Sequence, residues 1–220
     1  MKTVYFVRHG EATGNVGNFY QGEDSELTAK GLDQAQFLAK RCAKLPIEVI
    51  ISSTLTRAQQ TAQIISEGVG KPFETSELFV ERRKPTGLAD RLYEDEEARA
   101  LDTNWWKSLA GIGPRVLDGE NFDDLKKRAG AALSFLGDRP ENNSLVVTHG
   151  FYMRYLIARA LFGNDLTPAT LQPFILSLEV ENAGISVFHY RPDWSLLPWR
   201  KNLPKPDWRV WIWNDHAHLG

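Results

Sequence analysis

Runs of β-branched and aromatic residues alternate with helical patterns along this chain, and this alternation limits its fold more than any other feature. Residues 3–7, 48–52 and 144–148 have the composition of short buried strands. Apolar residues then recur at helical spacing over 28–45 and 55–69, and a further helical pattern follows the third strand. The alternation predicts an α/β fold, a three-layer α/β/α sandwich with a mostly parallel central sheet and ligands beyond the carboxyl ends of its strands.

The helix predicted after the first strand has recognisable start and stop signals. Thr28 is a candidate N-cap, and Pro46 lies just beyond the last apolar residue of the pattern. We expect its apolar face to pack on the core, and that face consists of Leu32, Ala35, Leu38, Ala39, Cys42 and Leu45. A second amphipathic helix is indicated before the third strand by Phe122, Leu125, Ala129, Ala132 and Leu136.

The composition fits one globular domain over residues 1–220, because 42% of the residues are hydrophobic and 25% are charged. A net charge of -2 offers no basic surface for a nucleic-acid backbone, so no such partner is expected. The first apolar run is too short for a signal peptide, and no segment is long and apolar enough to predict a membrane span. Cys42 is the only cysteine, which excludes an internal disulfide framework and favours the cytoplasm. The oligomeric state stays open, with a dimer as one candidate.

Residues 84–118 differ in character from the rest and are predicted to be a lid inserted into the domain. The stretch 88–115 is first acidic, then aromatic at Trp105 and Trp106, and then rich in glycine. The two tryptophans either close over a substrate or, as is more common for this residue type, anchor a core or an interface.

The C-terminal segment is unusual in composition. The last thirty residues hold five of the seven tryptophans and four of the eleven prolines. Residues 208–213 have strand composition, and the four prolines predict an extended connection before them. These prolines are Pro192, Pro198, Pro204 and Pro206.

Several residues at predicted strand ends have the chemistry of a phosphoryl-transfer site. Such a site needs a nucleophile, cationic donors for the nonbridging oxygens and an acid for the leaving oxygen. Arg8 and His9 follow the first strand, Arg57 begins the helix after the second, and His149 ends the third. Because the carboxyl ends of strands in such a sheet lie side by side, we expect these residues to meet.

The residues around these positions resemble the ordered motifs of the histidine phosphatase superfamily, which includes the cofactor-dependent phosphoglycerate mutases. Residues 8–15 read R-H-G-E-A-T-G-N and look like R-H-G-x-T-x-x-N, although Thr13 stands one place later than in the commonest pattern. Four further stretches resemble family motifs in the expected order, although Thr54 stands where proline is frequent. They are L-T-A-K-G-L-D-Q-A at 27–35, S-S-T-L-T-R-A-Q-Q-T-A at 52–62, G-E-N at 119–121 and V-V-T-H-G at 146–150. The resemblance covers residues 1 to about 190 and implies a phosphoglycerate mutase-like fold.

The resemblance also implies roles for the residues in these motifs. His9 would attack phosphorus through one ring nitrogen, while a backbone carbonyl holds the other nitrogen and fixes the neutral tautomer. Arg8 and Arg57 would bind the equatorial oxygens with their forked donors. His149 would donate to the same oxygens, and Asn15 would add a neutral donor. Gln21, Gly22 and Arg82 complete the expected set of substrate contacts.

The proton donor for the leaving oxygen is expected to be a glutamate. Glu81 occupies the matching position in the family, where it would protonate the leaving oxygen and then deprotonate the attacking water. Glu77 is the alternative. The three cations that follow, at 82–84, depart from the commoner glycine-containing run of the family. They either extend the anion site towards a second phosphate or carboxylate, or form a solvated turn.

The resemblance favours a phosphomonoester hydrolase that acts on a small phosphate ester through a phosphohistidine on His9. Two alternatives remain, a cofactor-dependent phosphoglycerate mutase and a catalytically weak protein that binds phosphorylated ligands. The acidic run at 94–97 speaks against the basic closed pocket of a mutase, and residues 214–219 resemble the N-D-x-x-H-L ending of some phosphatases of the family. His216 and His218 offer too few ligands for a metal and fit a polar turn, so neither a metal nor another cofactor is expected.

Overall fold

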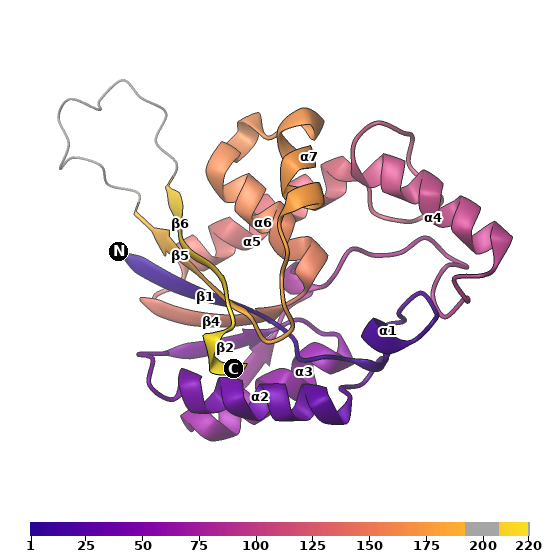
Figure 1. Ribbon diagram of the computed structural model, residues 1–220. Helices are drawn as coiled ribbons and strands as arrows, with labels where there is room; N and C mark the ends of the chain where they lie inside the picture. The colour runs from indigo at the N-terminus through magenta and orange to yellow at the C-terminus, as the bar shows by residue number, and fades with distance from the viewer. Residues whose placement is uncertain (192–206, 220) are drawn as a thin grey trace.

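A six-stranded sheet forms the centre of the protein, whose computed structural model describes residues 1–191 and 207–219. Its strands lie in the order β3-β2-β4-β1-β5-β6 (Figure 1). β3, β2, β4 and β1 are parallel to one another, whereas β5 is antiparallel to β1 and β6 is antiparallel to β5. The predicted mostly parallel sheet is therefore confirmed. The strands are β1 Lys2–Arg8, β2 Val49–Ser52, β3 Phe73–Thr75, β4 Asn143–Thr148, β5 Ile185–Tyr190 and β6 Trp208–Asp215.

Helices cover both faces of this sheet, which gives the predicted three layers. α2 and α3 pack on one face, and α5 and α6 pack on the other (Figure 1). The α-helices are α1 Thr13–Val16, α2 Ala29–Cys42, α3 Thr56–Val69, α4 Glu96–Leu109, α5 Phe122–Asp138, α6 Gly150–Phe162 and α7 Pro168–Ser177. Short 3₁₀ turns, labelled η1, η2 and η4, cover Glu77–Phe79, Gly163–Asp165 and Ala217–Leu219.

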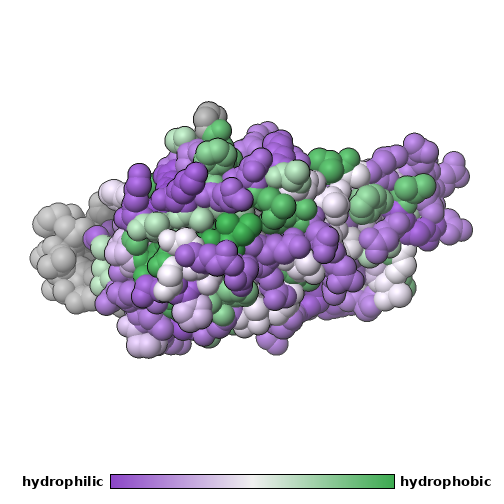
Figure 2. All heavy atoms as spheres, turned by 90° about the horizontal axis from the view of Figure 1, so that it is seen from below, coloured by the Kyte–Doolittle hydropathy of each residue, from purple (hydrophilic) through white to green (hydrophobic). Residues whose placement is uncertain are grey.

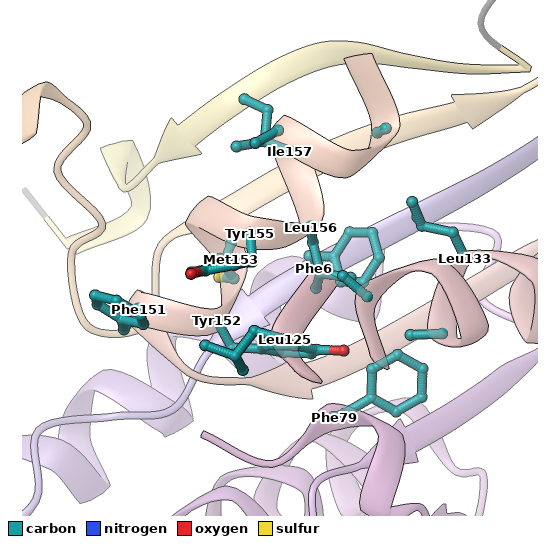
Figure 3. Close-up of a cluster of buried hydrophobic side chains, with 14 of the residues drawn as sticks. Phe6, Phe79, Leu125, Leu133, Phe151, Tyr152, Met153, Tyr155, Leu156 and Ile157 are labelled. Carbon is teal, nitrogen blue, oxygen red and sulfur yellow. The ribbon is translucent and has the colours of Figure 1, made fainter. Parts of the chain in front are cut away.

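The alternation of side chains along the central strands divides the core into two clusters. Phe6 of β1 and Val146 of β4 pack under α5 and α6, whereas Val7 and Val147, one position later, pack against α2 and α3. Figure 3 shows Phe6 and Phe79 in one cluster with side chains of α6, among them Tyr152 and Leu156. Each large apolar side chain buried in this way contributes about 1.5–3 kcal/mol to folding. The clusters fix the sheet, and with it the positions of the residues that follow β1 and β4.

The helix predicted from Thr28 is present as α2, with one difference on its apolar face. The Thr28 side chain accepts a hydrogen bond from Gly31 N, as an N-cap does. Leu32, predicted to be part of the buried face, is 42% exposed. Its position lies one residue beyond Gly31, about 100° round the helix, and Gly31 faces inwards.

The face of the molecule in Figure 2 is mostly hydrophilic with interspersed hydrophobic side chains.

The predicted lid contains helix α4, which is anchored to the core. Trp105 is fully buried, and its Nε1 donates a hydrogen bond to Glu120 O at 2.8 Å. Trp106 is partly buried and meets the ring of Phe151 edge-on at 5.3 Å. The two tryptophans thus anchor the core, the commoner of the two roles expected. That this segment is a lid stays a prediction.

At the C-terminal end, the strand predicted over 208–213 is confirmed as β6, which pairs with β5 at the edge of the sheet. The four prolines of the predicted extended connection lie outside the described residues. No described helix is both long and apolar enough to cross a membrane.

Candidate active site

The carboxyl ends of β1 and β4 bring the two predicted histidines together. His9 N donates a hydrogen bond to Thr148 O at 3.1 Å, which joins the residue after β1 to the last residue of β4. The ring centroids of His9 and His149 lie 5.0 Å apart, and both side chains are buried. Gly10 allows α2 to pack closely here, because a Cβ on it would lie 2.5 Å from Gly31 O in α2.

The hydrogen bonds of His9 define its reactive nitrogen. Its Nδ1 lies 2.7 Å from the carbonyl oxygen of Gly10, so this nitrogen carries the proton and donates. Its Nε2 accepts a hydrogen bond from the Nε–H of Arg57 at 3.3 Å. Burial, with the charges of Arg57 and Arg8 adding to it, lowers the pKa of His9 well below its usual 6.5. His9 is therefore a neutral imidazole with the lone pair on Nε2.

Two arginines flank this nitrogen and are held by backbone carbonyls. Arg57, at the start of α3, is 2% exposed and donates from Nη1 to Gly22 O at 3.2 Å. Burial lowers the pKa of Arg57 to about 10, so it stays charged at neutral pH. Arg8 donates from Nη1 to Val180 O, while its Nε is buried without a hydrogen-bond partner among the described residues. Both guanidinium groups keep donors for an anion.

His149 is held from behind by a serine. Its Nε2 lies 2.7 Å from Ser53 Oγ, and its Nδ1 is buried without a partner in the described part of the chain. Burial, together with the charges of Arg57 and His9, lowers the pKa of His149 well below 6.5. If the Ser53 hydroxyl donates to Nε2, Nδ1 carries the proton and is a donor.

A cavity of about 160 Å³, the inner cavity, opens beside His9. An outer cavity of about 260 Å³ adjoins it, and Gln21 and Glu81 line both. The residues of the inner cavity are Arg8, His9, Asn15, Gln21, Glu81, Gly150, Phe151, Arg154 and Val180. Arg57 lines the outer cavity, while His149 lies behind His9 and lines neither.

Glu81 and Glu77, the two candidate acids, occupy different places. Glu81 lines both cavities, and its carboxylate accepts hydrogen bonds from the backbone N–H groups of Arg82, Phe151 and Tyr152 at 3.0–3.2 Å. Glu77 lines only the outer cavity and is bound by Thr54 Oγ1 and by the guanidinium of Arg83. These hydrogen bonds lower the pKa of Glu77. Of the two carboxylates, only Glu81 lies beside the inner cavity.

The remaining predicted substrate contacts lie around the two cavities. Asn15 Oδ1 accepts from Ala12 N at 2.9 Å, and Gln21 Nε2 is buried without a partner among the described residues. Gly22 lines the outer cavity, where its carbonyl binds Arg57. The structure thus brings together the residues predicted at the strand ends. Gly22 contacts the site through its carbonyl oxygen, which accepts a hydrogen bond from Arg57.

Comparison with known proteins decides the family. The model of the histidine phosphatase superfamily (branch 1) matches residues 4–201. This chain belongs to that superfamily. The curated protein "Probable phosphoglycerate mutase GpmB" of Escherichia coli (strain K12 / DH10B) is 36% identical over 172 residues, which are 73% of this chain and 75% of the relative.

Solved structures of this superfamily share the whole fold. Bacillus stearothermophilus YhfR is 26% identical, with a TM-score of 0.79 and 100% of each chain covered. A mutant phosphoserine phosphatase from Entamoeba histolytica, in complex with phosphoserine, is also 26% identical over 100% of each chain, with a TM-score of 0.74.

One arginine beside the inner cavity was not predicted from the sequence. Arg154 lines the inner cavity from α6 and donates from Nε to Leu178 O at 2.7 Å. It lies four residues after Gly150, one helical turn past the second histidine motif. That spacing is the sequence signal that could have identified it.

A buried ion pair holds the segment that carries Glu81. Arg128 of α5 forms two hydrogen bonds with the Glu120 carboxylate, at 2.8 and 2.7 Å. It also donates to the carbonyls of Val80 at 2.7 Å and Glu81 at 3.2 Å. The G-E-N motif therefore supports the glutamate of the site. Removing one partner of such a buried pair costs about 3–5 kcal/mol.

A loop from the antiparallel side of the sheet supports His9 itself. Asn182 Nδ2 donates to His9 O at 2.9 Å, and Ala183 N donates to Arg8 O at 3.0 Å. Asn214 of β6 fixes this loop, because its Oδ1 accepts from Glu181 N at 2.7 Å. The C-terminal motif thus reaches the nucleophile through one loop. Sequence reasoning assigned it no such contact.

The two C-terminal histidines, which were not expected to bind a metal, contact groups of the protein. His216 Nδ1 lies 3.0 Å from Asn214 O, and His218 Nδ1 lies 3.1 Å from the guanidinium of Arg41. Within residues 1–191 and 207–219, no three His, Cys, Asp or Glu side chains gather as metal ligands would.

Proposed function

We propose that this protein is a metal-independent phosphomonoester hydrolase that forms a phosphohistidine on His9. One observation carries the proposal. The proton of the buried imidazole is on Nδ1, bound by the Gly10 carbonyl, so that Nε2 carries the lone pair, which accepts a hydrogen bond from Arg57 and lies within the influence of the Arg8 charge. A neutral imidazole with an oriented lone pair is a nucleophile, and the guanidinium groups neutralise the charge of the phosphoryl group.

In the first step, His9 Nε2 attacks phosphorus while the bond between phosphorus and the ester oxygen breaks. Glu81, in its acid form, transfers a proton to that oxygen, and the alcohol leaves. Arg8 and Arg57 bind the nonbridging oxygens, where negative charge accumulates in the transition state. The position of Glu81, lining both cavities, suits a group that must reach the oxygen between phosphoryl and leaving group.

In the second step, water takes the place that the alcohol has left. Glu81, now a carboxylate, accepts a proton from the water as its oxygen attacks phosphorus. The bond between phosphorus and Nε2 breaks, inorganic phosphate forms, and the lone pair returns to His9. The hydrogen bond from Nδ1 to the Gly10 carbonyl stabilises the positive charge that the ring carries in the intermediate.

A phosphoglycerate mutase is the second candidate, because the Escherichia coli relative at 36% identity is named as one. There the phosphoryl group would pass from His9 to a second bound substrate instead of water. The acidic run at 94–97 gives no argument against this activity. Asp95 caps α4 and pairs with Arg91, and none of the four residues lines either cavity.

The test measures inorganic phosphate released from a panel of phosphomonoesters in EDTA, beside 3-phosphoglycerate supplied with 2,3-bisphosphoglycerate. Phosphate release that His9→Ala abolishes, and that His216→Ala leaves intact, would support the hydrolase. His216 is an exposed histidine outside both cavities and so provides a matched control. Isomerisation without release would identify a mutase. Silence in both assays would favour the ligand-binding protein and overturn the proposal.

The substrate is a small phosphate ester, as the superfamily implies. We further propose a cytoplasmic location. Cys42, the one cysteine of the sequence, is a buried free thiol, which suits a reducing compartment.

A further inference from the structure

The C-terminal motif at 214–219 lies on helix α2, on the face of the sheet that α2 and α3 cover. Its turn η4 packs on α2, and the end of the chain lies beside that helix in Figure 1. Leu219 packs against the apolar cluster under α2 and α3. The reaction steps proposed for His9 and Glu81 use none of the residues of this motif.

Arg41, near the end of α2, binds two residues of the motif at once. Its Nη2 forms an ion pair with Asp215, and its Nη1 lies 3.1 Å from His218 Nδ1. A guanidinium can only donate, so His218 Nδ1 accepts and the neutral ring carries its proton on Nε2. That Nε2 is buried without a hydrogen-bond partner among the described residues. We call Arg41, Asp215 and His218 the C-terminal clamp.

The C-terminal clamp is joined directly to the loop that supports the nucleophile. Asn214, the residue before Asp215, accepts a hydrogen bond from Glu181 N at 2.7 Å. Asn182 of the same loop donates to His9 O at 2.9 Å. Because Asn214 and Asp215 are adjacent in β6, a displacement of the C-terminal turn from α2 also displaces the acceptor on which the loop depends.

His218 is the member of the C-terminal clamp whose charge changes near neutral pH. Burial, with the charges of Arg41 and His216 adding to it, lowers the pKa of His218, while the Ala183 backbone and Asp215 act in the opposite direction. The hydrogen bond from Arg41 lowers the pKa of Asp215 to about 2, and the same contact raises the pKa of Arg41. These two groups therefore keep their charges while His218 titrates.

We propose that His218 and Arg41 are positioning residues for the nucleophile, which hold the loop under His9 only while His218 is neutral. This rests on the proposed function of His9. Neutral His218 accepts from Arg41, the turn stays on α2, and Asn182 keeps the His9 carbonyl in place. A protonated His218 offers no acceptor at Nδ1 and brings a second positive charge beside Arg41. The turn then leaves α2, and turnover falls.

Two substitutions separate the hydrogen bond of His218 from its charge. In His218→Asn, the side-chain oxygen takes the position of Nδ1 and accepts from Arg41 at every pH. His218→Gln extends the amide towards the position of Nε2 and lacks that acceptor. With p-nitrophenyl phosphate at pH 7.5, His218→Asn should keep the wild-type kcat within about twofold. His218→Gln should lose about threefold or more in kcat, with KM unchanged, as the loss of one hydrogen bond predicts.

The pH profile is the measurement that a merely structural role would not change. The ratio of the wild-type kcat to that of His218→Asn should fall about threefold between pH 7.5 and pH 5, because only the wild type has a histidine to protonate at this position. The ratio removes the titration of the substrate and of Glu81, which both proteins share. His216→Gln, at the exposed histidine two residues earlier, is the matched control, and its ratio to the wild type should be flat.

Three results would overturn the positioning role. One is a flat ratio of the wild type to His218→Asn over this range of pH. Another is a His218→Gln protein as active as the wild type at every pH. The third is a lower unfolding temperature of His218→Gln with unchanged kcat, because the C-terminal clamp would then serve stability alone.

Nuclear magnetic resonance keeps the positioning role testable if the protein hydrolyses no ester. The Nδ1 proton of His9 is bound by the Gly10 carbonyl in a buried ring, so its exchange with water measures how firmly the nucleophile is held. At pH 7.5 we expect exchange about threefold or more faster in Arg41→Gln and in His218→Gln, and unchanged in His218→Asn. Equal exchange in all of these proteins would overturn the positioning role, whereas phosphate release by His9→Ala protein would overturn the proposed function alone.

Discussion

The inner and outer cavities differ in how the fold builds them. Around the inner cavity, His9 follows a strand, Arg8 ends one, and Arg154 projects from a helix. The outer cavity takes Arg82 and Lys84 from a connection between η1 and α4 that has no regular helix or strand. The sheet therefore fixes Arg8 and His9, while a connecting segment carries Glu81 and the cations that follow it. Such a division allows selectivity to change without loss of the reaction.

The largest effect should come from the cation that contacts His9. Arg57→Ala removes a buried cation beside His9 Nε2, and we expect kcat to fall by about 10²–10³ for every substrate, because a donor to the transition-state oxygens is lost. Steady-state kinetics with p-nitrophenyl phosphate and glycerol 3-phosphate measure this. Arg99→Ala, which removes an exposed arginine of α4, should change neither rate. A loss confined to one of the two substrates would assign Arg57 to recognition of the leaving group instead.

Glu81 lines both cavities, and its substitution should affect substrates differently according to their leaving group. In Glu81→Gln, turnover of glycerol 3-phosphate should fall about 10²-fold, because its alkoxide needs a proton to leave. Turnover of p-nitrophenyl phosphate, whose leaving group needs no proton, should fall much less when the first step limits the rate. Single-turnover kinetics on both substrates give the comparison. Equal losses would remove Glu81 as the acid and blur the distinction between the two cavities.

The outer cavity should respond to pH where the inner cavity does not. Lys84 is charged below its pKa of about 8 and neutral above it, and Arg82, Arg57, Glu81 and Asp102 are the charged groups that act on it. The ratio of kcat/KM for 3-phosphoglycerate to that for glycerol 3-phosphate should therefore fall about tenfold between pH 7 and pH 9. Arg57, with a pKa of about 10, stays charged over this range. In Lys84→Gln the ratio should be flat, and a fall that persists there would assign the titration to another group.

The smallest effect should come from the C-terminal support of the inner cavity. Asn214 has a positive φ of 51°, so Asn214→Gly keeps the backbone conformation and removes only the acceptor for Glu181 N. We expect kcat to fall severalfold with KM little changed, because the loop that holds the His9 carbonyl loosens. Trp211→Ala, at a 71% exposed position of the same strand, is the control. An unchanged kcat in Asn214→Gly would show that the loop holds His9 without this contact.

Much of the site was predictable because its residues lie at the ends of regular elements. A buried strand has a recognisable composition, so its last residue is known to within one or two positions, and His9 and His149 were located in this way. The motifs identified the superfamily, which the match over residues 4–201 confirms. The antiparallel side was harder to predict. β5 was missed, and the pairing of β6 with it joins segments on either side of residues 192–206.

The sequence by itself predicted a mostly parallel sheet from its periodicity and placed Arg8, His9 and Arg57 at the ends of strands or the start of a helix, while the resemblance to the superfamily supplied their expected roles. Only the tertiary structure decided which of the cations at 82–84 forms ion pairs. A three-residue charged run has no period to read, and its members were separated by distant partners. Glu77 and Glu120 neutralise Arg83, while the rings of Trp105, Trp106 and Phe151 leave the charge of Arg82 in place. Whether a buried cation is paired or available depends on which groups the fold brings within a few ångströms, and side-chain pairing of that kind is set by packing between segments far apart in the chain.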